Sequence, residues 1–540
     1  MSDRPPTRAG LARPALVAVL ALLALNGLLT LVNPGPMPWP RPDLRVAPEL
    51  CALVLLAAGL SAWRSAMPRG ALRMLAALTT AALLVRGVEI TSIALFGRSL
   101  NLYWDGRHLG EVLKMTGTSL WIAGGGALAG LAVVVLIWRF VCACWFAVGR
   151  GLADAPVRRG LAATAGVLLA VFALHDVAGL DTRRAFATAA TPVVLRQAEL
   201  LAGQWHADTA ASRLPASPAF DTGLGALKGG DVLLVFAESY GVSTLDDPRQ
   251  AAALAGPRAA LADALAARGA AVVSARVRSP TFGGGSWLAH GALLTGLDTQ
   301  NPLDYDVLLT TARPSLPKHF SAHGWRSIGW MPGLQRPWPE GSFFGFDRIV
   351  TADTMGYQGM PFGSWRIPDQ AAMALLDAQE LARGAAPRAP RFVVFPTVTS
   401  HAPFRPVAPY VADWDRLAGP APYSAAQRAH ALDEPVTWRD PVPAYLQSVA
   451  YTWQWLGAYL RDRAPSGLLT IVIGDHQPWA TVSGPGASWD VPVHVIGTDA
   501  ALLRRFEAAG FRPGLAPAGP PIGAMHELTA VLLRAFDAAP

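Results

Sequence analysis

Five long apolar stretches occupy the first third of the chain and constrain its fold more than any other feature. They cover roughly residues 14–33, 48–66, 74–97, 117–148 and 160–180. A helix needs about 20 apolar residues to cross a bilayer, so each stretch is a candidate membrane span. The first would suit a cleavable signal peptide, but four further spans follow it and favour an uncleaved helix. We therefore predict five transmembrane helices within residues 1–181.

Basic residues in the short connections predict the orientation of these helices. The N-terminal tail and the second and fourth connections together hold nine arginines, whereas the first and third connections hold five basic residues. Because basic residues concentrate on the cytoplasmic side, we expect the N-terminus in the cytoplasm and everything after about residue 181 outside it. The abundance of Ala, Gly and Pro is typical of a GC-rich bacterial genome. The expected location is therefore a bacterial inner membrane, with the exported part on its periplasmic side.

The composition of the whole chain argues against several classes of protein. Hydrophobic residues make up 52% and charged residues 15%, and the mean hydropathy is +0.30. Soluble chains carry about 25% charged residues, so neither a disordered chain nor a fully soluble enzyme is expected. The formal net charge is +7, but no basic run is interleaved with aromatic residues, and we expect no nucleic-acid partner. Cys51, Cys142 and Cys144 all lie in predicted spans, so the exported part has no disulfide framework.

A change in the hydrophobic pattern of the sequence predicts a second domain after residue 225. Residues 182–225 are predicted to be a linker that contains a helix-like stretch. From 226 to 540, short β-rich runs alternate with amphipathic stretches, a pattern typical of an α/β domain with a mostly parallel sheet. The predicted strands are 231–237, 270–277, 391–398, 468–473 and 491–496. The predicted helices are 250–268, 287–296, 311–323, 369–383, 440–462, 499–508 and 524–537.

Polar side chains follow several of these strands. Glu238 follows the first strand, His401 comes shortly after the third, and Asp475 and His476 follow the fourth. In parallel sheets, ligands bind beyond the carboxyl ends of the strands. A glutamate, an aspartate and a histidine form a mixed oxygen and nitrogen set that suits Zn²⁺ or Mn²⁺. Ser286 stands after three glycines at the start of a predicted helix. A helix N-terminus and a nearby metal ion stabilise a serine alkoxide and attract an anion. Together, Ser286 and the three possible metal ligands predict phosphoryl or sulfuryl transfer.

Three motifs carry a resemblance to a known superfamily. They are LLVFAES with Glu238, SWLAHGALLTG with Ser286 ten residues before Gly296, and IVIGDHQP with Asp475 and His476. In this order, behind five apolar stretches, they resemble the alkaline phosphatase and sulfatase superfamily. Within it the chain looks like the lipoteichoic acid synthases and the phosphoglycerol and phosphoethanolamine transferases, which have five N-terminal helices and an extracytoplasmic sulfatase-like domain. The resemblance implies that these four side chains bind one divalent metal ion and that Ser286 takes up the phosphoryl group covalently.

Departures from the superfamily's patterns narrow the prediction. Leu288 and His290 stand where formylglycine-forming sulfatases carry Pro or Ala and then Arg, which argues for plain serine chemistry and against a sulfatase. Asp490 and His494 have the spacing of a second metal motif, but they come after Asp475 and lie in a predicted strand. One metal ion is therefore expected, with Mn²⁺ favoured and Zn²⁺ as the alternative, because a histidine ligand suits these ions better than Mg²⁺. The lipoteichoic acid synthases use threonine as nucleophile, which makes Thr281 the alternative to Ser286.

The resemblance also suggests substrate contacts. His401 matches a histidine that contacts substrate phosphate in the transferases. Arg336 and Trp338 lie near the place where these transferases have an arginine and an aromatic residue at that phosphate. His290, one helical turn past Ser286, either supports the site or contacts substrate.

The function expected from this reading is metal-dependent transfer of a phospholipid headgroup to a cell-envelope acceptor. The donor would be a membrane glycerophospholipid, and the acceptor a glycan, lipid or polymer hydroxyl. Phosphoglycerol is favoured, since phosphoethanolamine transferases often have disulfides in this domain and this chain has none there. The alternatives are a membrane-anchored hydrolase of phosphate or sulfate esters, and an inactive protein that keeps the fold.

Overall fold

The computed structural model describes residues 8–33, 40–64, 67–101, 105–106, 120–178, 184–187, 190–203, 214–335, 338–382 and 388–537. The chain divides into two compact units, one of Met1–Ala94 with Ser99–Ala202 and the other of Leu95–Arg98 with Gly203–Pro540. Each unit has its own buried core.

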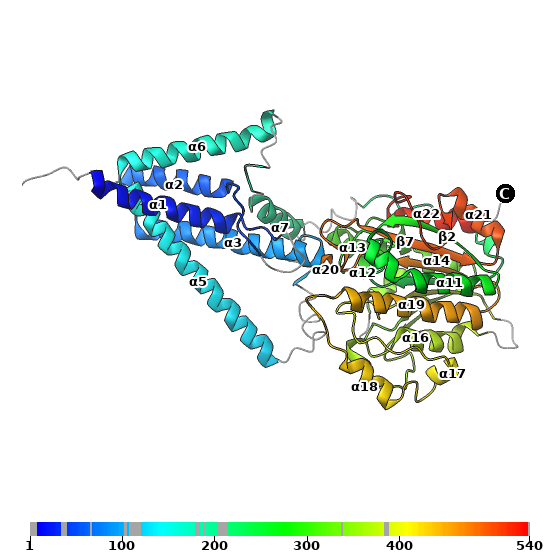
Figure 1. Cartoon of the computed structure of the whole chain (residues 1–540). Helices are drawn as coiled ribbons and strands as arrows, with labels where there is room; N and C mark the ends of the chain where they lie inside the picture. The colour runs from blue at the N-terminus through cyan, green and yellow to red at the C-terminus, as the bar shows by residue number, and fades with distance from the viewer. Residues whose placement is uncertain are drawn as a thin grey trace, which may run out of the picture. The chain divides into compact units, whose positions relative to one another are not determined.

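The first unit is helical (Figure 1). Its helices are α1 (Arg8–Leu29), α2 (Pro48–Arg64), α3 (Arg69–Phe96), α5 (Leu120–Leu152), α6 (Ala155–Ala178) and α7 (Thr191–Gly203). Within the described residues, Arg69–Phe96, Gly124–Leu152 and Ala155–Leu174 are long and apolar enough to cross a membrane, and Arg13–Leu29 is a shorter apolar helix. The structure thus supports several membrane-crossing helices, and the number five stays a prediction.

Helix α7 lies within the predicted linker and is held to the first unit by polar contacts. The Arg196 guanidinium pairs with Glu89 of α3 at 3.0 Å, and the Gln197 amide donates to the carbonyl of Leu100 at 2.6 Å. The backbone N–H of Thr191 donates to Glu49 of α2 at 3.3 Å. Since Glu89 is buried, its pairing with Arg196 offsets the cost of a carboxylate among apolar helices.

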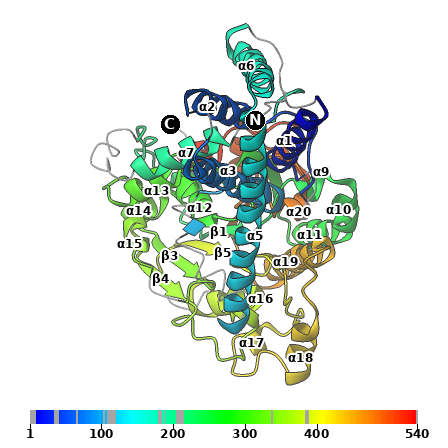
Figure 2. The same ribbon diagram turned by 90° about the vertical axis from the view of Figure 1, so that its left-hand side faces the viewer.

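The second unit is built on one eight-stranded sheet, with strand order β4-β3-β5-β1-β6-β7-β2-β8. Figure 2 shows β4, β3, β5 and β1 following one another across it. Strands β4, β3, β5, β1 and β6 are parallel, whereas β7 runs antiparallel to both β6 and β2. The strands are β1 (Val232–Ala237), β2 (Ala271–Arg278), β3 (Arg326–Met331), β4 (Arg348–Thr351), β5 (Arg391–Pro396), β6 (Leu469–Gly474), β7 (Asp490–Gly497) and β8 (Arg512–Pro513). The predicted mostly parallel α/β architecture is confirmed.

Helices cover both faces of this sheet, and strand β1 shows the two sides. Leu233 and Val235 pack in one core with α11, α16 and α19, while the ring of Phe236 contacts His290 of α12. All six residues of β1 and of β6 are buried, which is why both read as continuous apolar runs. The helices are α9 (Ser243–Asp246), α10 (Pro248–Ala253), α11 (Ala255–Ala267), α12 (Ser286–Thr295), α13 (Pro302–Leu309), α14 (Leu316–Ala322), α15 (Gly341–Phe344), α16 (Asp369–Leu376), α17 (Trp414–Leu417), α18 (Ala425–Asp433), α19 (Val442–Asp462), α20 (Ala480–Ser483), α21 (Ala500–Ala508) and α22 (Met525–Phe536).

The elements differ from the predicted ones in a few places. The predicted helix 250–268 is two helices, α10 and α11, which meet at Leu254. Pro257 has no N–H to donate to the carbonyl of Ala253 four residues earlier, so one continuous helix is interrupted there and Pro257 lies in the first turn of α11. The predicted helix 311–323 begins only at Leu316, where Ser315 accepts a hydrogen bond from the backbone of Lys318 as its N-cap. Three strands, β3, β4 and β8, were not predicted, and neither were six short helices, α9, α13, α15, α17, α18 and α20.

Candidate active site

The carboxyl ends of the central strands bring the predicted polar side chains together. Glu238 directly follows β1, and Asp475 and His476 directly follow β6, its hydrogen-bonded neighbour. One ligand atom from each of these three residues lies within 4.8 Å of the other two, and all three are buried. The Nε2 atom of His476 is 3.5 Å from Glu238 Oε1 and 3.7 Å from Asp475 Oδ2.

The two oxygens of Asp475 have different surroundings. Oδ1 accepts hydrogen bonds from the backbone N–H groups of Ser239 and His476, both at 2.7 Å. Oδ2 is buried and has no hydrogen-bond partner among the described residues. A buried carboxylate oxygen without a partner is costly, and a cation would remove that cost.

The ring of His476 is oriented by its own chain. Its Nδ1 atom lies 2.7 Å from the carbonyl of Gln477, which can only accept, so Nδ1 carries the proton. Nε2 therefore presents its lone pair to the cluster, as a metal-ligating histidine does.

Electrostatics also favour a cation between these groups. Burial, followed by the charge of Asp475, raises the pKa of Glu238 well above its usual range. Burial raises the pKa of Asp475 too, but His476, His290 and hydrogen bonds outweigh it, and the pKa of Asp475 is lowered. Two neighbouring buried carboxyls and an imidazole lone pair fit a divalent ion of the Mn²⁺ or Zn²⁺ type.

Ser286 faces this cluster from the start of α12. Its Oγ atom is 3.2 Å from Glu238 Oε2 and 3.2 Å from His476 Nε2. Gly283, Gly284 and Gly285 precede it with φ values of 65°, 136° and 80°, a region that glycine adopts freely. The three glycines therefore allow the tight turn that begins the helix at the serine, where backbone N–H groups favour an anion.

The alternative nucleophile, Thr281, has a different environment. It is buried, and its hydroxyl donates to the carbonyl of Gly284 rather than to the cluster. The same turn is fixed by the N–H of Gly283, which donates to the carbonyl of Gln477 at 3.1 Å. Thr281 thus stabilises the glycine turn that presents Ser286.

His290 lies one turn further along α12. Its ring centroid is 4.2 Å from that of Phe236, and its Nε2 atom is buried without a partner among the described residues. Burial lowers the pKa of His290 to about 4, so the ring is neutral at pH 7. A neutral ring cannot supply the positive charge that an arginine would supply at this position.

His401 follows β5, the other neighbour of β1. Its Nδ1 atom is 2.7 Å from the carbonyl of Ala402, so Nδ1 donates and Nε2 remains an acceptor. Burial lowers the pKa of His401. The hydrogen bond to Ala402 and the charge of Asp475 oppose this decrease, and the charge of a protonated His476 adds to it. The ring of Trp365 lies 4.7 Å away at 61°. Sequence reasoning missed Trp365, because only the folded chain brings it to the histidine.

The turn between β5 and His401 also holds Glu238 in place. The backbone N–H of Glu238 donates to Thr397 Oγ1 at 3.0 Å, and Ser400 Oγ donates to the carbonyl of Glu238 at 2.6 Å. Asp369 is fully buried and accepts hydrogen bonds from the N–H groups of Val398 and Thr399 at 2.8 and 2.9 Å. Burial raises the pKa of Asp369 to about 6. This buried carboxylate fixes the turn that links the two strand ends.

Of the remaining predicted substrate contacts, the structure describes only Trp338. Arg336 lies outside the described residues. Trp338 is in the connection after β3, and its ring stacks on Phe344 at 5.5 Å and 26°. The described contacts therefore give Trp338 a packing role.

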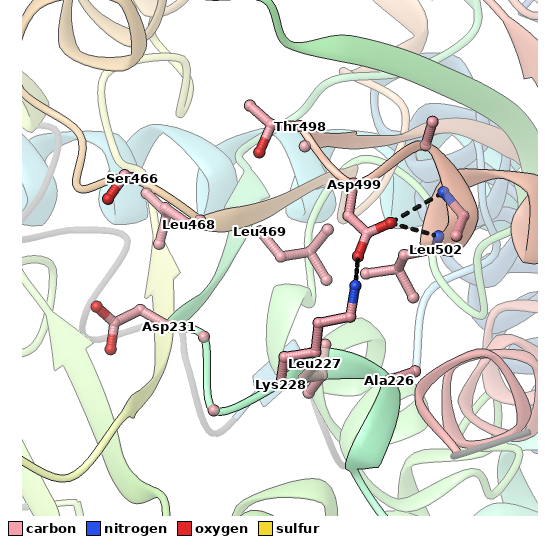
Figure 3. A pocket seen from close by; sticks show the side chains of 16 residues that line it. Ala226, Leu227, Lys228, Asp231, Ser466, Leu468, Leu469, Thr498, Asp499 and Leu502 are labelled. Atoms are coloured by element: carbon pink, nitrogen blue, oxygen red, sulfur yellow. Dashed lines mark hydrogen bonds and ion pairs between the residues drawn. The ribbon is translucent and has the colours of Figure 1, made fainter.

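A cavity of about 680 Å³ lies at the opposite edge of the sheet, at the amino ends of β1 and β6. Figure 3 shows Lys228 reaching Asp499 there, at 2.6 Å. Asp499 also caps α21 through the N–H groups of Ala501 and Leu502. Since Glu238 and Asp475 follow the carboxyl ends of the same strands, this cavity is separate from the cluster.

No family model matches the chain, and no curated protein matches it in sequence. Among solved structures, it is similar to an alkaline phosphatase superfamily protein from Vibrio parahaemolyticus, with 18% identity, 53% of this chain and 63% of that chain covered, and a TM-score of 0.34. It is also similar to the lipoteichoic acid synthase LtaP from Listeria monocytogenes, with 13% identity, 50% of this chain and 66% of that chain covered, and a TM-score of 0.32. A third similar structure is the C-terminal periplasmic domain of EcEptC from Escherichia coli in complex with Zn, with 14% identity, 50% of this chain and 73% of that chain covered, and a TM-score of 0.34.

The chain spans about two thirds or less of the first two of these structures. Its expected place in the alkaline phosphatase and sulfatase superfamily rests on the sequence motifs and stays a prediction. The residues that carry the resemblance are Glu238, Ser286, Asp475 and His476, which the fold places at one edge of a mostly parallel sheet.

Proposed function

We propose that this protein transfers a phospho-headgroup, phosphoglycerol first, from a membrane glycerophospholipid to a cell-envelope glycan, lipid or polymer through a covalent intermediate on Ser286. One observation carries the proposal: the Ser286 hydroxyl lies 3.2 Å from both Glu238 and His476 at the start of α12. In this position the hydroxyl can give its proton to a neighbouring acceptor. The backbone N–H groups at the start of the helix can stabilise the negative charge of a phosphate.

Glu238, Asp475 and His476, together with the hydroxyl of Ser286, would hold one divalent ion, with Mn²⁺ first and Zn²⁺ second. When bound, such an ion lowers the pKa of the serine hydroxyl and offsets charge on the phosphoryl oxygens.

Ser286 and His401 have different roles in the two halves of the proposed reaction. Ser286 Oγ gives up its proton to Glu238 beside it and attacks phosphorus in line. An Oγ–P bond forms, the bond from phosphorus to the lipid oxygen breaks, and that oxygen takes up a proton and leaves as diacylglycerol. In the second half, an acceptor hydroxyl attacks the phosphoserine and restores Ser286. His401 suits the proton transfer from that hydroxyl, since its Nδ1 is engaged with Ala402 and its Nε2 accepts. Water in place of the acceptor would make the protein a hydrolase.

The donor experiment uses the full chain in lipid nanodiscs with Mn²⁺. With phosphatidylglycerol labelled in the headgroup, we expect diacylglycerol release and a phosphoglycerol adduct on Ser286, detected by intact mass and peptide mapping. Phosphatidylethanolamine in a parallel sample tests the second headgroup. Efficient cleavage of small soluble phosphate or sulfate esters, with no diacylglycerol released from either lipid, would instead support the anchored hydrolase.

The proposed orientation places the N-terminus in the cytoplasm and the second unit on the periplasmic side of the inner membrane. The apolar helices and the bias of basic residues support it. Reporter fusions after residue 155 and after residue 225 should report opposite sides, cytoplasmic and periplasmic respectively. Fusions that report the same side would contradict this topology.

A further inference from the structure

The connection between α18 and α19, residues 434–441, exposes apolar side chains beside the candidate site. Val436 is 38% exposed and Trp438 is 50% exposed. Among the described residues of the second unit, Trp438 is the only Phe, Tyr or Trp side chain that is exposed, whereas Trp330 and Trp455 are fully buried. Its exposure suggests a contact surface for another molecule.

Two contacts tie this connection to the loops that carry His476 and His401. The ring of Trp438 stacks on Trp479, three residues after His476, at 6.2 Å and 19°. Glu434 pairs with the Nε atom of Arg405, four residues after His401, at 2.9 Å. Arg405 also donates to Gln447 of α19 at 2.7 Å. The exposed tryptophan is thus held next to both site loops.

The apolar surface continues along α18. Leu432 is 39% exposed and lies one helical turn past Arg428, whose Nε atom donates to the carbonyl of Pro361 at 2.9 Å. This bond brings the chain around Met360, which is 65% exposed, to the same side of α18. We define Met360, Leu432, Val436 and Trp438 as the apolar rim.

The size and charge of the apolar rim indicate its occupant. Four partly exposed side chains are far fewer than a stable protein interface uses, which is about 20 residues on each side. Asp433 and Asp440 offset the charges of Arg428 and Arg439, so no strong field selects a charged partner. The chain carries helices long enough to cross a bilayer, and because they lie on the same chain as the rim, lipid is presented to the rim at high effective concentration. Tryptophan prefers the boundary between headgroups and acyl chains.

We propose that the apolar rim inserts into the headgroup–acyl boundary of the bilayer and holds the loops of His401 and His476 at the level of lipid phosphates. The contact itself stands apart from the proposed function, and its effect on donor use rests on that function. Because burial of apolar surface drives it, the contact should depend little on salt or on the fraction of anionic lipid.

The direct test places a fluorescent label at position 438 of the full chain in nanodiscs. Trp438→Cys is made in a background with Cys51, Cys142 and Cys144 replaced, and lipids carrying a quencher near the headgroups are added. The matched control is Ile522→Cys, because Ile522 is an apolar residue of the same unit, 37% exposed, that lies outside the rim. We expect strong quenching at 438 and little at 522, at both low and high salt. Equal quenching at the two positions, none at 438, or loss of quenching at high salt would overturn the proposal.

A kinetic test separates the rim from the chemistry. Trp438→Ala combined with Val436→Ser should raise the apparent KM for bilayer lipid severalfold and leave turnover of a water-soluble short-chain phosphodiester unchanged. An equal loss with both donors would contradict a role in lipid contact. If the unaltered chain turns over neither donor while the label at 438 is still quenched, the proposed function fails and the membrane contact stands.

Discussion

Replacing Ser286 by alanine should remove the covalent intermediate and reduce turnover by several orders of magnitude. The substitution deletes the hydroxyl that lies 3.2 Å from both Glu238 and His476 at the start of α12. The exchange would then have no nucleophile, whereas the buried carboxyls and the helix start would remain. Trapping the protein with labelled lipid, followed by intact mass analysis, measures the intermediate, and release of diacylglycerol measures the turnover.

Thr281→Ala is the matched control, because Thr281 is the other hydroxyl of the glycine turn. Its loss removes the bond to the Gly284 carbonyl but leaves Ser286 in place. We expect a much smaller fall in turnover, with the intermediate still formed, and recovery in Thr281→Ser, which keeps the hydroxyl. If Ser286→Ala still forms the phosphorylated intermediate and Thr281→Ala does not, Thr281 is the nucleophile and the assignment is wrong.

The fold was predictable where local pattern and burial agree. Strands β1 and β6 are buried along their whole length, so their sequences are continuous apolar runs that stand out. Strand β3 (RSIGWM) begins with an exposed arginine and contains a glycine, and β4 has only four residues. Strand β3 pairs with β5 on one side and with β4 on the other, and β4 pairs with β3, so the information that makes both segments strands lies in their partner strands.

The candidate site divides in the same way. Glu238, Asp475 and His476 come directly after strands, so their meeting at one edge follows from parallel order alone. The roles assigned to them and to Ser286 stay predictions, although the structure brings the four side chains together. Trp365 and Asp369 act through contacts with the turn after β5, more than twenty residues away in sequence, and no local motif indicates them. Trp338 was suggested by its position near a family motif; its ring packs on Phe344, and its contact with substrate stays a prediction.

Removing the carboxylate of Asp475 should strip most of the bound metal and, with it, most of the activity. In Asp475→Asn, the unpartnered Oδ2 position is occupied either by an amide nitrogen, which repels a cation, or by a neutral oxygen that attracts it less. Glu238→Gln should have a similar effect, because Glu238 lies within the same cluster. Metal content per chain, measured by elemental mass spectrometry after dialysis against Mn²⁺ or Zn²⁺, should be near one in the unaltered protein and much lower in both variants.

Asp490→Asn is the control for loss of one negative charge. Asp490 begins β7 and is not part of the cluster, so its replacement should leave metal content unchanged. Thermal unfolding adds a second readout with a definite sign. In metal-free protein, the unfolding temperatures of the unaltered chain and of Asp475→Asn give the baseline for each chain. Added metal should then stabilise the unaltered chain and not the variant, because only a folded site with both carboxylates binds the ion. Metal content and metal-induced stabilisation that survive both Asp475→Asn and Glu238→Gln would show that the ion is held elsewhere.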